Sequence, residues 1–155
     1  MIPLNPWEHQ NAIKTLYSKC VEGICTRHGI TRMELDILLF LANNPCFDTA
    51  TDIVEIRYLS KSQVSSSIKT LEERGYIRRE YRENNKKTVH LRICEEARPV
   101  ITDGREAQER FADIMLQGVT EEERECMRRC FDHICRNIDE YFRQMEKDGW
   151  ITGDA

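Results

Sequence analysis

Apolar residues recur every three or four positions over most of this chain, and capping residues or glycines separate the stretches in which they do so. This period is typical of amphipathic helices. A first long helix is predicted from about residue 6 to residue 28, where Gly29 ends it. A second helix begins at Thr31, which with Glu34 has the spacing of a capping box, and ends before Pro45.

Two short helices joined by a tight connection are predicted in the middle of the chain. The first has Asp48 or Thr49 as its N-cap and continues to about Arg57. The second begins at Ser60, which with Gln63 forms a further capping-box pattern. Such a pair of helices is typical of a helix-turn-helix.

The second short helix, which Gly75 ends, has two different faces. Val64, Ile68 and Leu71 share one side at about 100° per residue and are expected to face the core. The outward side is small, hydroxylated and positive, although serine is only a moderate helix former. Its residues are Ser62, Ser66 and Lys69, flanked by Ser65 and Thr70, and the one acid on this side is Glu73 near the C-terminal end. A helix with small outer side chains fits the major groove of DNA, about 12 Å wide, where hydroxyl and amino groups reach phosphates and base edges.

Beyond this helix the period changes to two. Residues 76–82 and 88–93 are predicted to form two strands joined by a charged tip. Basic side chains on such a hairpin can follow a phosphate backbone or enter a minor groove. They are Arg78, Arg79, Arg82, Lys86 and Lys87. A hairpin directly after a DNA-reading helix is a wing, so the sequence predicts a mainly α fold that contains a winged helix-turn-helix.

The last third of the chain predicts two long helices. The first of them has Pro99 in its first turn or at a kink and ends at Gly118. The second begins at Thr120, with Glu123 as its capping partner, and ends at Gly149. Their apolar stripes are too long for one chain to cover, so a two-fold related copy is expected to bury them. The residues expected at this dimer interface are Ile13, Tyr17, Phe111, Ile114, Met127, Phe131, Ile134, Ile138 and Phe142.

Charge is distributed unevenly along the chain. The 155 residues carry a net charge of −4, yet residues 57–92 contain ten Lys or Arg and only four acids, a net of +6, which leaves −10 for the rest. A basic segment in an acidic protein indicates a site for a polyanion. No apolar run is long enough to span a membrane and the first residues do not form a secretory signal, so a cytoplasmic protein without a membrane partner is expected. The sequence has no Gly-rich phosphate loop, nucleophile elbow or zinc-protease motif, which argues against an enzyme, and no cofactor is expected.

The run DTATDIVEIRYLSKSQVSSSIKTLEERGYIRRE, followed by a charged tip and TVHLRI, resembles the MarR family of bacterial transcription regulators. The resemblance implies a single MarR-like domain over residues 1–155, with a DNA-binding lobe over about 31–93 and dimerisation helices over about 6–28 and 95–148. It further implies a homodimer that binds double-stranded DNA at a pseudo-palindromic operator, as a repressor that a small-molecule effector releases.

The resemblance also assigns DNA contacts within the lobe. The expected contact residues are Ser60, Lys61, Ser62, Gln63, Ser65, Ser66, Lys69, Thr70, Arg78, Arg82, Lys86 and Lys87. The wing departs from the family pattern, because RENNKK stands where an Asp-x-Arg arrangement is usual, and lysine cannot copy a bidentate arginine. After the second strand, Cys94 stands in place of a capping threonine, which weakens the start of the next helix.

A small aromatic or phenolic effector is also implied by the resemblance, in a cleft between the dimerisation helices and the DNA-binding lobe. Tyr17, His28 and Met33 are the residues expected to line that cleft. The alternative to a DNA-binding regulator is a protein-interaction module. It explains the long amphipathic helices but neither the basic wing nor the hydroxylated helix face.

Seven cysteines leave a redox- or metal-responsive regulator as a further alternative. A sensor thiol must be exposed and have a lowered pKa, and Cys25 and Cys46 are the candidates. Cys126, Cys130 and His133 share one side of the last helix and are weak candidates for a metal site, because their spacing is not diagnostic of one. Unpaired cysteine is otherwise a small buried apolar residue.

Overall fold

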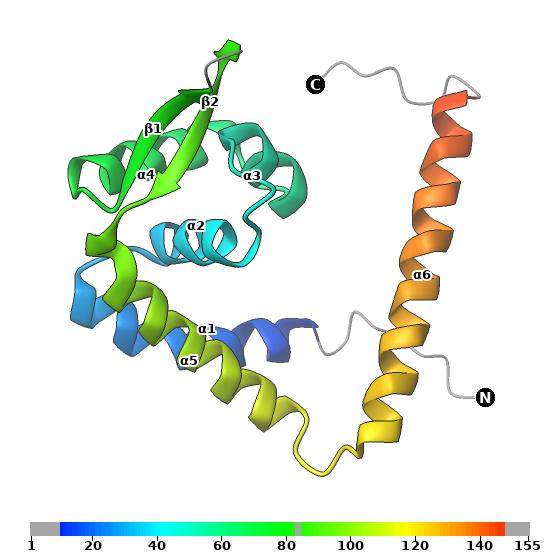
Figure 1. Cartoon of the computed structure of the whole chain (residues 1–155). Helices are drawn as coiled ribbons and strands as arrows, with labels where there is room; N and C mark the ends of the chain where they lie inside the picture. The colour runs from blue at the N-terminus through cyan, green and yellow to red at the C-terminus, as the bar shows by residue number, and fades with distance from the viewer. Residues whose placement is uncertain (1–9, 83–84, 148–155) are drawn as a thin grey trace. The chain divides into compact units, whose positions relative to one another are not determined.

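The computed structural model describes residues 10–82 and 85–147 and confirms a mainly α fold with one β-hairpin. The chain divides into two compact units, residues 1–115 and residues 116–155. The elements, labelled in Figure 1, are α1 (Gln10–His28), α2 (Arg32–Asn43), α3 (Ala50–Arg57), α4 (Lys61–Glu73), β1 (Ile77–Arg82), β2 (Asn85–Ile93), the short 3₁₀ helix η1 (Glu95–Ala97), α5 (Arg98–Met115) and α6 (Glu121–Lys147).

Local capping signals account for most helix boundaries. Thr31 is the N-cap of α2, and its side chain and that of Glu34 bond reciprocally to the backbone, so this capping box is confirmed. Thr49, and not Asp48, caps α3, because Asp52 at the third helical position completes a second box with it. Three predicted glycine stops, Gly29, Gly75 and Gly118, all have positive φ. Pro99 lies in the first turn of α5, as predicted.

Other boundaries differ from the sequence prediction or lie outside the described residues. Ser60 accepts a hydrogen bond from the Gln63 backbone N–H at 3.3 Å, but it donates its own proton to Gln63 Oε1 at 2.9 Å, so only half of that capping box forms. The second strand begins at Asn85, three residues earlier than predicted, because Asn85 pairs with Arg82 across a register shift. The predicted start of the first helix at residue 6 and the predicted stop of the last helix at Gly149 both lie outside the described residues.

The core of the first unit is built around α2. Leu35, Ile37, Leu38 and Leu39 of this helix are at most 2% exposed. In Figure 1, α1 and α5 lie side by side on one side of α2, and α4 packs on it from the other. Val64, Ile68 and Leu71 of α4 are buried, which confirms the inward face expected from the helical period. The hairpin runs beside α4 and projects beyond it (Figure 1).

The approach of α5 to α2 depends on one glycine. A Cβ atom placed on Gly104 would lie 2.8 Å from Leu39 Cδ2, closer than real Cβ atoms approach, and 3.2 Å from Leu35 Cδ1, which is a tight contact. Glycine therefore sets the distance between these two helices. Because α5 also packs against α1, this contact positions both long helices of the first unit on α2.

The second unit consists mainly of α6, a helix of 27 residues. Thr120 and Glu123 form its predicted capping box, with bonds of 2.8 and 3.3 Å. From residue 121 to residue 144 every side chain is exposed, including the whole predicted apolar stripe up to Phe142. Among the described helices, none is both long and apolar enough to cross a membrane.

Candidate nucleic-acid interface

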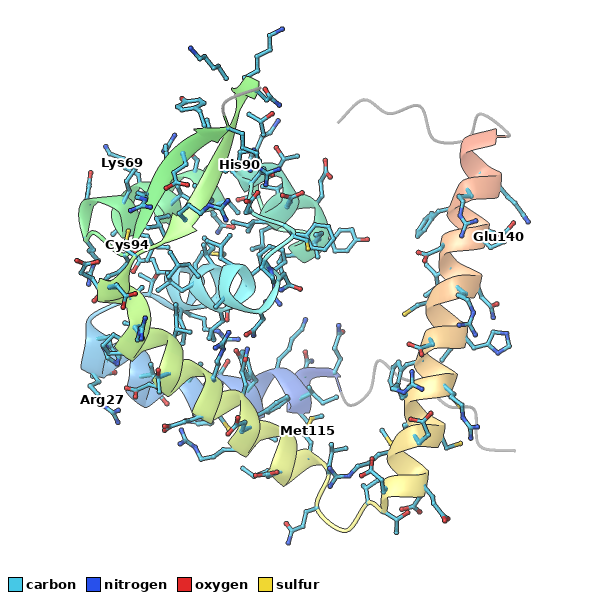
Figure 2. All side chains as sticks on the ribbon, viewed as in Figure 1. Arg27, Lys69, His90, Cys94, Met115 and Glu140 are labelled. Atoms are coloured by element: carbon cyan, nitrogen blue, oxygen red, sulfur yellow. The ribbon has the colours of Figure 1, made fainter. Side chains whose placement is uncertain are left out.

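The outward face of α4 presents the hydroxyl and amino groups that the sequence predicted. Lys61, Ser62, Gln63, Ser65, Ser66 and Lys69 are exposed, and Thr70 is half-buried. Lys69 extends from α4 into solvent (Figure 2) and lies 3.8 Å from Glu73 one turn further on. Both side chains are more than 60% exposed, so this pair holds Lys69 only weakly.

Two of the hydroxyl groups are already used within the helix. Thr70 Oγ1 donates to the Ser66 carbonyl oxygen at 3.2 Å, and Ser60 Oγ caps the first turn. Ser62 Oγ lies 3.5 Å from Ser60 Oγ, so Ser65 and Ser66 form the open part of this face, together with the amino group of Lys69. The first turn of α4 contains no acidic residue, so its unpaired backbone N–H groups keep their attraction for an anion.

Arginines along the hairpin are held by acids of the same lobe. Arg78 and Arg92 both contact Glu80, at 2.7 and 3.2 Å, and Arg79 contacts Glu72 at 3.0 Å. The hydrogen bond from Arg78 is the main reason why the pKa of Glu80 lies below its ordinary value. These pairs order the strands but reduce the positive charge that the arginines offer to a ligand.

The positive charge at the hairpin tip comes from Lys86 and Lys87. Both are exposed, and among the described residues neither forms an ion pair. Asn85 shapes this end of the strand, because its Oδ1 accepts hydrogen bonds from the backbone N–H groups of Lys87 (3.0 Å) and Thr88 (3.3 Å). The two lysines are thus placed by the backbone, and their ammonium groups remain available to a polyanion.

A buried Asp–His pair anchors the hairpin to the start of α3. Asp48 and His90 are 6% and 7% exposed, and Asp48 Oδ1 accepts from His90 Nδ1 at 2.6 Å. Figure 2 labels His90 on β2. The second carboxylate oxygen faces Arg82 at 3.3 Å and Arg92 at 3.7 Å, and the Asp48 backbone carbonyl accepts from the Leu91 N–H at 2.7 Å. One residue therefore holds both strands of the wing.

Charge at this anchor is well compensated. Burial by itself raises the pKa of Asp48. The hydrogen bond and the charge of His90 lower it, as do the charges of Arg82 and Arg92. The lowering effects are larger, so the pKa of Asp48 lies below its ordinary value. Arg82, a predicted DNA contact, is thus tied at its guanidinium to a buried carboxylate while most of its side chain stays exposed. The sequence interpretation treated Asp48 only as a possible helix cap and did not single out His90.

A second polar cluster joins the end of α4 to the long helices of the same unit. Arg74, just after α4, donates to the backbone oxygens of Gly29 at 2.6 Å and His28 at 3.4 Å, at the end of α1. His28 and Arg27 in turn both contact Asp103 of α5 at 2.8 Å. The hydrogen bond from His28 is the main reason why the pKa of Asp103 is lowered. His28 is therefore engaged in helix packing.

Of the two cavities described among residues 10–82 and 85–147, one is lined by Tyr17 and neither by His28 or Met33, the other residues expected around an effector. Tyr17 packs edge-on against Phe111, with ring centroids 5.2 Å apart, and lines a cavity of about 80 Å³. His28 is paired with Asp103, and Met33 packs against the core. A larger open groove, about 530 Å³, lies along α1 and reaches the start of α2. Its lining residues are Lys14, Thr15, Ser18, Lys19, Val21, Glu22, Cys25, Thr26 and Arg32.

Within the part of the chain that the structure describes, the cysteines belong to no cluster of metal-ligating side chains. Among residues 10–82 and 85–147, no group of three or more His, Cys, Asp or Glu side chains is placed to do so, and Cys126, Cys130 and His133 are all exposed. Cys46 is exposed and Cys25 is half-buried. Burial raises the pKa of the Cys25 thiol, which disfavours the thiolate that an oxidant sensor needs.

Comparison with known proteins connects this lobe to one family. The family model described as MarR family matches residues 28–87, which include α2, α3, α4 and β1. No curated protein matches the chain. A solved structure described as a MarR family transcriptional regulator from Listeria monocytogenes, complexed with 26mer DNA, is 20% identical, with a TM-score of 0.76 over 92% of this chain and 94% of that one.

Two further solved structures have the same fold. The transcriptional regulator SlyA is 20% identical, with a TM-score of 0.73 over 91% of this chain and 99% of that chain. The Staphylococcus aureus MepR–DNA complex is 14% identical, with a TM-score of 0.69 over 86% of this chain and 95% of that chain. At these identities the likeness establishes the fold. Together with the family match over residues 28–87, it confirms the resemblance to the MarR family.

Proposed function

Because residues 28–87 match the MarR family and the chain has the fold of that family's transcriptional regulators, we propose that it is a sequence-specific DNA-binding regulator. The observation that carries the proposal is the open hydroxylated face of α4 beside a hairpin with two exposed lysines at its tip. In this proposal α4 enters a major groove, and Lys86 and Lys87 contact the phosphate backbone or the neighbouring minor groove. That two of the similar structures are complexes with DNA supports this arrangement.

We further propose that the active form is a homodimer. The exposed apolar residues of α6 follow the alternating spacing of four and three of a helix seam: Met127, Phe131, Ile134, Ile138 and Tyr141. An exposed stripe of this length requires a partner helix, and a two-fold copy of the same chain supplies one. Two copies of α4 then read the two halves of a pseudo-palindromic operator.

Release of the operator by a small molecule is the regulatory part of the proposal. The groove along α1 supports it, because its size suits a small ligand and its lining combines the apolar Val21 with the cations Lys14 and Arg32. These groups favour a ligand with an apolar body and an anionic group. Lys19 also lines the groove but pairs with Glu22 at 3.7 Å. The groove ends beside Arg32, whose guanidinium also lies 4.3 Å from the centre of the Tyr17 ring.

Fluorescence anisotropy tests the proposal directly. Labelled DNA fragments from the region upstream of the protein's own gene are titrated at two salt concentrations, beside a random fragment of equal length. We expect tight binding to one fragment, with an affinity that falls steeply as salt rises, because bound lysines and arginines displace counterions from the phosphates. The absence of binding to any fragment at low salt would favour a protein-interaction module instead.

A further inference from the structure

Tyr58 occupies a backbone position that favours glycine. It ends α3 with φ 51° and ψ 46°, and it is the one non-glycine residue with positive φ among residues 10–82 and 85–147. The backbone N–H groups of Tyr58 and Leu59 both donate to the Val54 carbonyl oxygen, that of Leu59 at 3.1 Å. These two bonds make the left-handed conformation of Tyr58 part of the helix end. At the other positive-φ helix ends the chain uses Gly29, Gly75 and Gly118.

The side chain of Tyr58 contributes nothing to the core. It is 93% exposed, the largest exposure among the large apolar residues described. Leu59, the next residue, makes the apolar contact that normally accompanies such a helix end, because it packs against the core cluster. A tyrosine is therefore favoured here neither by the backbone nor by packing. Strained non-glycine positions of this kind cluster at functional sites.

The surroundings of Tyr58 are those of the candidate DNA interface. It precedes Ser60, the N-cap of α4, by two residues, and exposed Lys61 and Ser62 follow directly. No acidic residue occurs from position 56 to position 71. An exposed phenol beside a helix N-terminus, in a segment with positive charge only, suits an anionic partner. A tyrosine hydroxyl is among the neutral groups that commonly donate to phosphate oxygens of DNA.

We propose that Tyr58 contacts the DNA backbone, with its hydroxyl donating to a phosphate oxygen at the edge of the groove that α4 enters. This inference rests on the proposed DNA binding and adds one uncharged contact to it. The contact positions the N-terminus of α4 on the duplex, and it carries no sequence information of its own. The strained backbone at residue 58 is then the cost of placing an aromatic donor beside the recognition helix.

The test compares the wild type with Tyr58→Gly and Tyr58→Phe, using Thr102→Val on α5 as the matched loss of an exposed hydroxyl. We expect Tyr58→Gly to unfold at the same temperature as the wild type or higher, because glycine fits φ 51°. We expect its affinity for operator and random DNA to fall by a common factor of about ten, and that of Tyr58→Phe by about three or more. The salt dependence should stay unchanged, because a neutral donor displaces no counterion.

Each outcome bears on the inference. If the wild type binds DNA and Tyr58→Gly binds it with the same affinity, the inference about Tyr58 is overturned, while the proposed function stays intact. Loss of affinity confined to the operator would also contradict a backbone contact. If Tyr58→Gly kept its DNA affinity but changed the molecular mass in sedimentation, Tyr58 would belong to a protein contact and the inference would be wrong. A wild type without DNA affinity would remove both the proposed function and this contact.

Discussion

The imidazole of His90 and the carboxylate of Asp48 form a buried pair, 2.6 Å apart, between residues 42 positions distant in the chain. Asp48 stands directly before the N-cap of α3, and His90 lies in the middle of β2. Since Asp48 also contacts Arg82 on the other strand, the pair determines where the wing leaves the helical lobe. An ionised carboxylate can only accept a hydrogen bond, so His90 carries a proton on Nδ1.

Acid sensitivity should depend on this pair. Because the pKa of Asp48 is lowered in the folded state, its ionised form stabilises the fold at every pH above the ordinary aspartate value of about 4. That contribution is lost as the pH falls through the lower, folded-state pKa. We expect Asp48→Asn to lower the free energy of unfolding at pH 7 by about 3 kcal/mol. The variant should also lose less stability than the wild type below pH 4.

Urea unfolding at several pH values measures both effects, and Asp139→Asn, at an exposed position on α6, is the matched control. A parallel pH dependence of the wild type and Asp48→Asn below pH 4 would show that Asp48 is not the group responsible.

The packing of α5 on α2 should be sensitive to a single methyl group. In Gly104→Ala the new Cβ meets Leu39 at 2.8 Å, so the side chains of this buried contact must shift. Overpacking costs about 1–3 kcal/mol and exceeds the gain of up to about 1 kcal/mol from the better helix former. We expect a net loss of roughly 1 kcal/mol in urea unfolding. Gly23→Ala is the control, because nothing lies within 4 Å of its added Cβ and it should stabilise α1.

Removal of the hairpin lysines should weaken DNA binding without changing its sequence preference. If Lys86 and Lys87 each neutralise one phosphate, the double alanine variant should lower the slope of log affinity against log salt by about 0.9 per lysine in each subunit. Anisotropy at four salt concentrations gives that slope. Lys14→Ala with Lys19→Ala removes the same charge from α1 and should leave the slope nearly unchanged. A loss limited to the operator sequence is incompatible with a phosphate contact.

The open face of α4 should determine sequence preference. Ser66→Ala with Lys69→Ala removes two outward groups that make little contribution to the fold, since both are exposed. We expect the ratio of operator to random affinity to fall about tenfold or more, because a good base contact is worth about 1–3 kcal/mol. Competition between the two DNAs measures this ratio, and Ser18→Ala with Lys14→Ala on α1 is the matched control. An unchanged ratio would exclude α4 as the reading helix.

Charge introduced into the α6 stripe should separate the subunits. Ile138 lies near the centre of the exposed apolar stripe, so Ile138→Asp would place a carboxylate in the proposed dimer interface. We expect a folded monomer in sedimentation and a DNA affinity reduced by at least a hundredfold, because one half-site contact is lost. Arg136→Asp, on the opposite side of the same helix, should remain dimeric. A dimer of Ile138→Asp at micromolar concentration would place the interface elsewhere.

Several features of the fold could be predicted from the sequence because they depend on residues that are close together in the chain. The capping boxes at Thr31 and Thr120 and the glycine stops involve residues at most five positions apart. The inward face of α4 follows from the helical period alone. Prediction was less successful where two local partners compete, as at Ser60, whose hydroxyl bonds to the Gln63 side chain and leaves the capping box half formed.

The sequence by itself therefore determined the order of the helices, the wing and the open face of α4, because short-range hydrogen bonds and periodicity specify them. Only the tertiary structure decided which contacts hold these parts together. They are the hydrogen bonds of Asp48 with His90 and of Arg74 with the end of α1, and the close packing of Gly104 against Leu39. Each of these contacts joins residues more than 40 positions apart. These contacts form only in the folded chain. Burial there excludes the water that would otherwise compete for each polar group, and leaves each polar or bulky group with one partner in the protein.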